Sequence, residues 1–279
     1  MPTFYDTHAH LDYPDFETDL DQFVSRANAA GISKIISIGT DFGSSERAIQ
    51  LAEKFPGVYA VVGWHPNDCE TAPDDIRPKL RELAQHKKVV ALGETGLDYH
   101  RLPSSKKTEA TPQDDERVKK KQAEVFKQHL EVAAELGLNC VIHQRDAFED
   151  TLAQLKPFAD KVRGVFHCFV GTPDEMRRVL ALNSLVSFTG IATFKGAQTV
   201  RDTLAATPLD QFMLETDSPF LAPVPYRSKR CEPAYVKEIS EVAAQVKGCS
   251  LDELSKATCA TAEKFFKKLS RDGREGGEG

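Results

Sequence analysis

Residues 163–175, RGVFHCFVGTPDE, contain a candidate strand and the start of a candidate helix. The segment 163–166 ends in valine and phenylalanine, residue types that are enriched in strands. Thr172, Pro173 and Glu175 form an expected capping box, with proline at the first helical position. His167 follows the strand directly. The stretch therefore predicts one βα unit with a polar side chain at the carboxyl end of its strand.

The same alternation of short β-branched segments and amphipathic segments recurs along the 279 residues. The candidate strands are residues 3–7, 34–38, 58–63, 89–92, 139–142, 163–166, 185–189 and 212–214. Strands that alternate with helices pair in parallel, and eight is the number that closes a barrel. We therefore predict an α/β fold: a single (β/α)8 TIM-barrel domain over residues 1–269, with C-terminal helices covering its outside.

Two segments depart from this pattern. Residues 102–121 are polar and charged, and they predict a loop insertion after the fourth strand. Two interpretations stay open: a solvated, mobile insertion, or a lid that contacts substrate, because loops after strands lie on the catalytic face of a barrel. Residues 270–279 are rich in glycine and glutamate and are expected to be a disordered tail.

Composition excludes several classes of protein. Hydrophobic residues make up 41% and charged residues 28%, which is typical of a globular protein with a sizeable core. The net charge of −6 argues against binding nucleic acid through a global basic surface, but not against gripping a few phosphates locally. No membrane span or signal peptide is expected. The six cysteines form no C-x-x-C pair, so we expect reduced thiols and a cytoplasmic enzyme.

Five of the eight histidines and two carboxylates fall at the ends of predicted strands. They are His8, His10, His65, His143, His167, Glu94 and Asp217. An H-x-H pair alone is a weak signal, although residues two apart on a strand share a face. A carboxylate directly after an apolar strand is costly unless a cation compensates it. Four histidines together with both carboxylates at one rim predict a binuclear metal site with nitrogen and oxygen ligands.

The chain resembles the TatD family of metal-dependent deoxyribonucleases, within the amidohydrolase-like TIM-barrel superfamily. The resemblance rests on seven motifs in one order: DTHAHLD, VGWHP, LGETGLDY, VIHQRDA, GVFHCF, LETDSPFLAP and KRCEPAYV. It runs from about Asp6 to Phe266. The sequence departs from the family pattern at Gln144 and Cys231 and in the length of the 102–121 insertion. These departures bear on substrate preference and touch no expected ligand.

The resemblance implies a role for each motif residue. His8, His10 and Asp217 would hold one divalent metal, His143 and His167 the second, and Glu94 would bridge them. Asp217, His65 and Glu94 are the expected catalytic residues, and Arg145, Arg227 and Arg230 match positions that face the substrate. The implied activity is 3′→5′ exonuclease cleavage of DNA with magnesium.

The metal and the substrate both leave alternatives open. Four imidazoles favour zinc, manganese, iron or nickel, whereas magnesium prefers oxygen ligands, so the metal's identity stays open. The expected partner is single-stranded DNA or a 3′ end, with RNA as a further possibility, bound by a monomer or weak oligomer. One alternative is hydrolysis of small esters, amides or D-aminoacyl-tRNA at the same metal site. A metal-holding interaction module without turnover is the second.

Overall fold

In the computed structural model, which describes residues 2–106 and 109–269, eight parallel strands form one sheet in chain order. They are β1 (Phe4–Ala9), β2 (Ile32–Ile38), β3 (Val58–Val62), β4 (Val89–Asp98), β5 (Cys140–Arg145), β6 (Gly164–Phe166), β7 (Leu185–Phe188) and β8 (Phe212–Leu214). The ring is closed beyond the end of β8, where the backbone N–H of His10 donates to Ser218 O at 2.8 Å. The predicted TIM barrel is confirmed.

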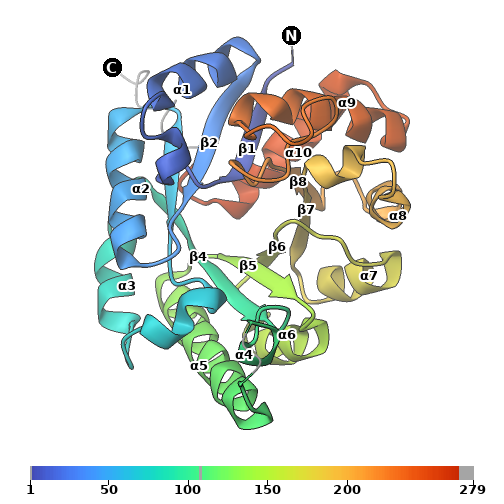
Figure 1. The fold of residues 1–279 in the computed structure, drawn as a ribbon. Coiled ribbons are helices and arrows are strands. Elements are labelled where there is room, and N and C mark those ends of the chain that lie inside the picture. Colours follow the sequence, from blue (N-terminus) through green and yellow to red (C-terminus); the bar gives the residue numbers. More distant parts are fainter. Residues whose placement is uncertain (1, 107–108, 270–279) are drawn as a thin grey trace.

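Helices follow one another around the strands in chain order (Figure 1). They are α1 (Leu20–Ala29), α2 (Phe42–Lys54), α3 (Arg77–Ala84), α4 (Pro103–Lys106), α5 (Pro112–Leu136), α6 (Phe148–Leu155), α7 (Pro173–Ala181), α8 (Gln198–Ala206), α9 (Val236–Lys247) and α10 (Leu251–Phe265). Among the described residues, none of these helices combines the length and apolar character needed to cross a membrane. All six cysteines are free thiols.

The C-terminal helices were expected on the outside of the barrel, and this is wrong for the end of α10. Phe265, Phe266 and Leu269 pack with inward-facing strand residues such as Val61 and Val141. The amide of Asn139, just before β5, also donates to Phe265 O at 2.6 Å. Phe265, at the end of α10, and the following Phe266 therefore fill the amino end of the barrel. Burying these two side chains removes a large apolar area from water, which stabilises the fold.

Strand β4 extends six residues beyond its predicted end, so Glu94 lies inside a strand rather than after one. Residues 95–98 pair with residues 142–145 of β5. This pairing requires glycine on both sides of Glu94, since a Cβ at Gly93 or Gly96 would collide with the backbone of β5. Both glycines have positive φ, 123° and 138°, which other residues rarely adopt.

The expected loop over residues 102–121 is wrong for most of its length. Residues 103–106 form α4, and residues 112–121 are the first turns of α5. Thr111 caps α5 through a capping box with Asp114, and Pro112 occupies the first turn. The lysines at 119–121 lie on a helix whose buried face includes Val118. The expected disordered tail, 270–279, lies outside the described residues.

Candidate metal centre

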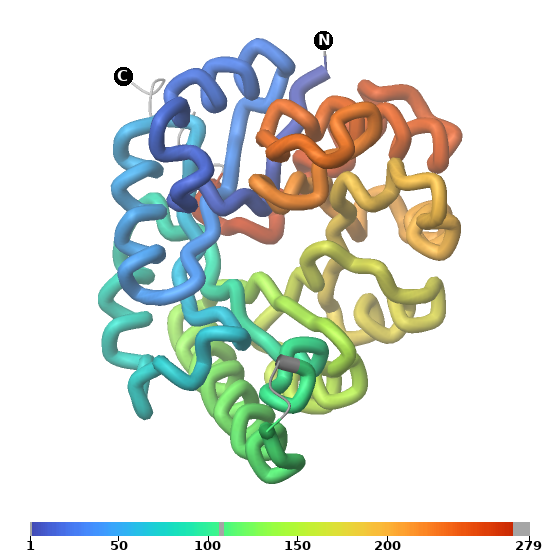
Figure 2. Tube along the Cα trace, viewed as in Figure 1, coloured from blue at the N-terminus to red at the C-terminus, as the bar shows by residue number. Residues whose placement is uncertain are grey.

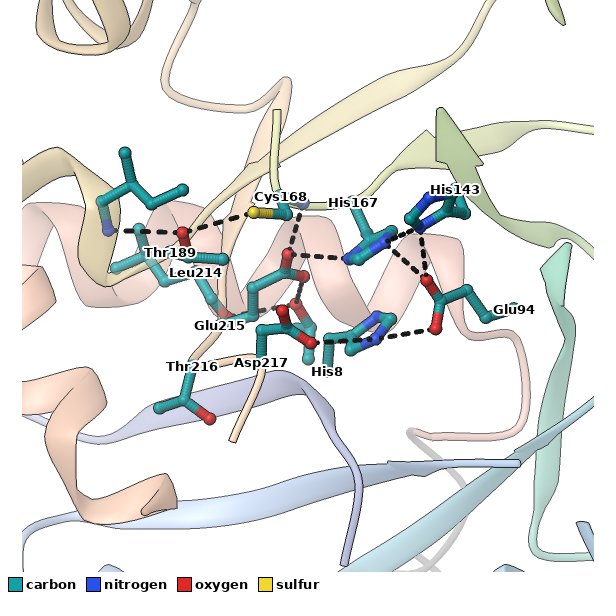
Figure 3. Close-up of polar contacts among 12 residues, drawn as sticks. His8, Glu94, His143, His167, Cys168, Thr189, Leu214, Glu215, Thr216 and Asp217 are labelled. Carbon is teal, nitrogen blue, oxygen red and sulfur yellow. Dashed lines mark hydrogen bonds and ion pairs between the residues drawn. The ribbon is translucent and has the colours of Figure 1, made fainter. Parts of the chain in front are cut away.

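Glu94 lies at the centre of a cluster of imidazoles at the carboxyl end of the barrel (Figure 3). Its side chain is 3% exposed. Oε2 lies 3.4 Å from His8 Nε2 and 3.7 Å from His10 Nε2. Oε1 lies 2.7 Å from His167 Nε2, 2.9 Å from His143 Nδ1 and 3.4 Å from His65 Nε2. Each oxygen of one carboxylate thus faces a different group of histidines.

Asp217 lies beside His8 and His10, after the end of β8. Its Oδ1 is 3.4 Å from His10 Nε2 and 3.7 Å from His8 Nε2. The backbone of Asp217 has φ 59°, and its N–H donates to His8 O at 2.9 Å. The turn after β8 therefore brings this carboxylate back against β1. His8 and His10 lie between two carboxylates, Glu94 and Asp217.

The donor atoms of this cluster fit divalent cations. Three groups have ligand atoms within 4.8 Å of one another: His8, His10 and Asp217; His8, Glu94 and His167; and His65, Glu94 and His143. Both ring nitrogens of His8, Nδ1 of His10 and Oε2 of Glu94 are buried without a hydrogen-bond partner in the described part of the chain. Buried polar atoms are normally satisfied, so these atoms indicate a missing cationic partner. Mixed imidazole and carboxylate donors suit zinc, manganese, iron or nickel.

Electrostatics keep Glu94 ionised. Burial acts to raise the pKa of Glu94, but His167, His65 and His8 around it hold that pKa well below its ordinary value. Burial likewise acts to lower the pKa of His167, yet Glu94 and Glu215 raise it well above the ordinary value. The centre therefore keeps a buried anion that needs positive charge close by.

Two further carboxylates lie behind the imidazoles, and sequence reasoning missed both. Asp98 Oδ2 lies 3.0 Å from His143 Nε2. Glu94 Oε1 lies 2.9 Å from Nδ1 of the same ring, so a carboxylate faces each ring nitrogen of His143. Burial acts to lower the pKa of His143, but Asp98 and Glu94 raise it. Glu215 Oε1 lies 3.7 Å from His167 Nδ1 and accepts the backbone N–H of Cys168 at 2.7 Å. The available signal was spacing: Asp98 follows Glu94 by four residues, and Glu215 precedes Asp217 by two.

His65 has a different hydrogen-bond pattern. Its Nδ1 accepts the backbone N–H of Asn67 at 3.1 Å, so the neutral ring carries its hydrogen on Nε2. Burial lowers the pKa of His65, which favours this neutral form. Nε2 faces Glu94, and His65 therefore presents a hydrogen-bond donor to the centre.

The three arginines expected to face substrate are in different situations. Arg145 is exposed at the end of β5, and within the described residues it has no ion pair or side-chain hydrogen bond. Arg227 lies over the ring of Phe194, 3.7 Å from its centroid. Arg230 is held by Asp19, 2.7 Å away, and lies over the ring of Phe23. The three side chains thus have different surroundings.

Two of the three histidines outside the strand-end set have partners of their own. His129 is buried on α5, where its Nε2 accepts the backbone N–H of Trp64 at 3.0 Å. His100 pairs with Asp146 at 2.8 Å in an exposed position.

Comparison with known proteins identifies relatives over almost the whole chain. Residues 5–267 match the model of a family described as TatD related DNase. An uncharacterized metal-dependent hydrolase of Bacillus subtilis, YabD, is 37% identical over 94% of this chain and 98% of its own. A protein of Cronobacter sakazakii named 3′-5′ ssDNA/RNA exonuclease TatD is 35% identical over 95% of this chain and 98% of its own. The crystal structure of YjjV, a TatD homologue of Escherichia coli K12, has a TM-score of 0.83 and 27% identity, covering 95% and 98%.

Proposed function

The chain belongs to the TatD-related DNase family of metal-dependent hydrolases, and from this premise we propose that it cleaves phosphodiester bonds in single-stranded nucleic acid. We propose further that it acts from the 3′ end, that DNA is its main substrate, and that two divalent metal ions assist the reaction. The observation that carries the proposal is the position of Glu94, whose two oxygens face separate groups of imidazoles.

The proposed ligands follow from that position. His8, His10 and Asp217 would hold one divalent ion, His143 and His167 would hold a second, and Glu94, whose oxygens face both groups of imidazoles, would serve both. When bound, such ions neutralise phosphate oxygens and lower the pKa of water. Asp98 and Glu215 lie behind the histidines of the second group and orient their rings.

Three residues of the chain act on the substrate in this proposal. Asp217, at the edge of the site, accepts the proton of the attacking water and returns it to the leaving oxygen. His65 donates from Nε2 to a phosphate oxygen, because its Nδ1 is occupied by the Asn67 N–H. Arg145, exposed and unpaired within the described residues, offers planar donors that match a phosphate in the approaching strand.

The free thiols support a reducing, cytoplasmic setting for this reaction.

The test is a panel of divalent metals against single-stranded oligonucleotides labelled at the 3′ or the 5′ end. We expect progressive shortening from the 3′ end, with zinc, manganese or magnesium, and no cleavage in chelator. A D-aminoacyl ester and a neutral lactone serve as comparison substrates. Faster turnover of either one than of the oligonucleotide would replace this proposal with the small-substrate alternative.

A further inference from the structure

Exposed large apolar side chains gather at one end of the barrel. Within residues 2–106 and 109–269 there are four, of which three follow β6 or β8 at the carboxyl end: Val170, Phe220 and Val224. The fourth, Leu136, ends α5. Phe220 is 49% exposed and lies three residues after Asp217. An apolar surface is therefore retained in water beside the metal centre, where a substrate has to enter.

Phe220 belongs to a cluster of three aromatic rings in mutual contact, of which it is the most exposed. Its ring centroid is 5.8 Å from that of Tyr13 and 6.2 Å from that of His10. Tyr13 in turn stacks on His10, with centroids 4.8 Å apart and an interplanar angle of 30°. We call His10, Tyr13 and Phe220 the aromatic wall. It leads without interruption from the surface to a histidine of the metal centre.

The aromatic wall is held in place by the segments that carry it. The Phe220 N–H donates to Asp217 O at 2.9 Å, which fixes the turn after β8. Further along this segment, Arg230 pairs with Asp19, and Glu232 accepts two N–H groups of Arg26. These pairs join the segment after β8 to α1 and the residue before it, which lie beside each other in the trace of Figure 2. Phe220 is thus positioned without being buried.

Such an arrangement matches a stacking site for a nucleobase. An aromatic side chain that is rigid and half exposed can accept a flat ring with little loss of conformational entropy. Every base has a π-face, so stacking tolerates any sequence, but the base must be unpaired to reach the wall. The neighbouring metal centre is lined by carboxylates such as Glu94 and Asp217. The exposed ring of Phe220 therefore provides the apolar surface beside it on which a base can stack.

We propose that the aromatic wall binds the unpaired base of the nucleotide next to the cleaved phosphate, with Phe220 as its outer contact. The inference rests on the proposed nuclease function and adds the group of the substrate that is recognised. The base stacks on the wall while its phosphate reaches the metal centre. The wall thereby selects single strands and frayed ends.

The first experiment compares oligonucleotides that end in a normal nucleotide or in an abasic one. The wild-type protein is expected to cleave the normal end roughly tenfold or more faster in kcat/KM, the size of effect that one stacked base produces. Phe220→Ala is expected to lose this preference and Phe220→Trp to keep it. Val224→Ala is the matched control, because Val224 is an apolar residue of similar exposure on the same segment but carries no aromatic ring.

The second experiment measures binding without turnover. A 3′-terminal 2-aminopurine beside a phosphorothioate linkage is mixed with the zinc-loaded protein, and its fluorescence is expected to fall on stacking. The fall should disappear in Phe220→Ala and persist in Phe220→Trp and Val224→Ala. Equal quenching by Phe220→Ala, or an unchanged preference for the normal end, overturns the inference. If the wild type cleaves no oligonucleotide with any metal, the proposed function is overturned instead. The fluorescence measurement then still tests whether a base stacks on the aromatic wall.

Discussion

At Glu94 a single buried side chain serves both groups of imidazoles, and its two neighbouring glycines make its position possible. Gly93 and Gly96 let β4 approach β5 closely enough for Oε1 to reach His143 and His167. The same carboxylate turns Oε2 to His8. Its charge is balanced within the protein by the surrounding imidazoles.

Replacing Glu94 with glutamine removes this charge with almost no change in volume. We expect bound metal to fall by at least one ion per chain and kcat/KM on oligonucleotide to fall about a thousandfold or more, because an amide is a poor bridging ligand. Metal content by mass spectrometry and unfolding of the metal-free protein are the measurements. Glu263→Gln, at the opposite end of the barrel, is the control. Wild-type metal content in Glu94→Gln would contradict the bridging role.

Asp98 is expected to act through His143 rather than on substrate. Asp98→Asn keeps the size of the side chain but weakens its hold on the Nε2 hydrogen of His143. We expect metal affinity to fall roughly 10- to 100-fold, the usual effect of losing such a partner, and the loss to be measurable by competition with a chromogenic chelator. Asp146→Asn, which alters the exposed pair with His100, should leave affinity unchanged. If Asp98→Asn and Asp146→Asn bound metal with equal affinity, Asp98 would not act on metal binding through His143.

At the scale of elements, capping explains where three helices begin. Thr111, Thr172 and Ser250 each accept the backbone N–H of the third helical residue, and the acidic side chain at that position reaches back to the cap. Two of these boxes coincide with a proline in the first turn. The charged stretch before residue 121 is helical for this reason, although its composition resembles that of a loop.

We expect Thr111→Ala, Thr172→Ala and Ser250→Ala each to cost about 1 kcal/mol of stability, because each leaves an amide of the first turn without its partner. For a chain of this size the melting temperature should fall by about 2–4 °C. Differential scanning calorimetry gives the change. Thr71→Ala removes a hydroxyl that caps no helix start and is the control. A control shift as large as the three others would rule out capping as the cause.

At the scale of the whole molecule, the proposed function requires an acidic protein to attract a polyanion. The net charge is −6, and the centre itself is rich in carboxylates. Bound metal ions would reverse the local sign, and Arg145 adds an unpaired cation at the end of β5 within the described residues. Attraction is therefore expected to be local and to depend on metal loading.

We expect kcat/KM for an oligonucleotide to fall steeply as salt rises from about 50 to about 200 mM, because phosphate contacts release counterions. Turnover of a neutral ester should change little over the same range. Arg145→Gln should flatten the salt slope by about one unit. Arg77→Gln, which breaks pairs with Asp75 and Glu131 on an outer helix, should not alter the slope. If kcat/KM for the ester fell with salt as steeply as kcat/KM for the oligonucleotide, phosphate contacts would not be the cause of the salt dependence.

Much of the barrel could be predicted because its signals are local. β-branched segments and amphipathic stretches alternate at short range, and the carboxyl ends of parallel strands meet at one edge. His8, His143 and His167 could be grouped for this reason before any contact was known. The ends of β4 and β5 could not, since residues 95–98 are extended only through pairing with residues 142–145.

The sequence by itself determined the order of the elements, the family and the set of strand-end histidines and carboxylates. Only the tertiary structure decided what each atom faces. The N–H of Asn67 sets the tautomer of His65, Asp98 and Glu94 face the two ring nitrogens of His143, and Asp19 engages Arg230 within the protein. It also decided that α10 closes the amino end of the barrel. The physical reason is that tautomers, ion pairs and burial depend on groups that are distant in the chain, whereas periodicity records only neighbours.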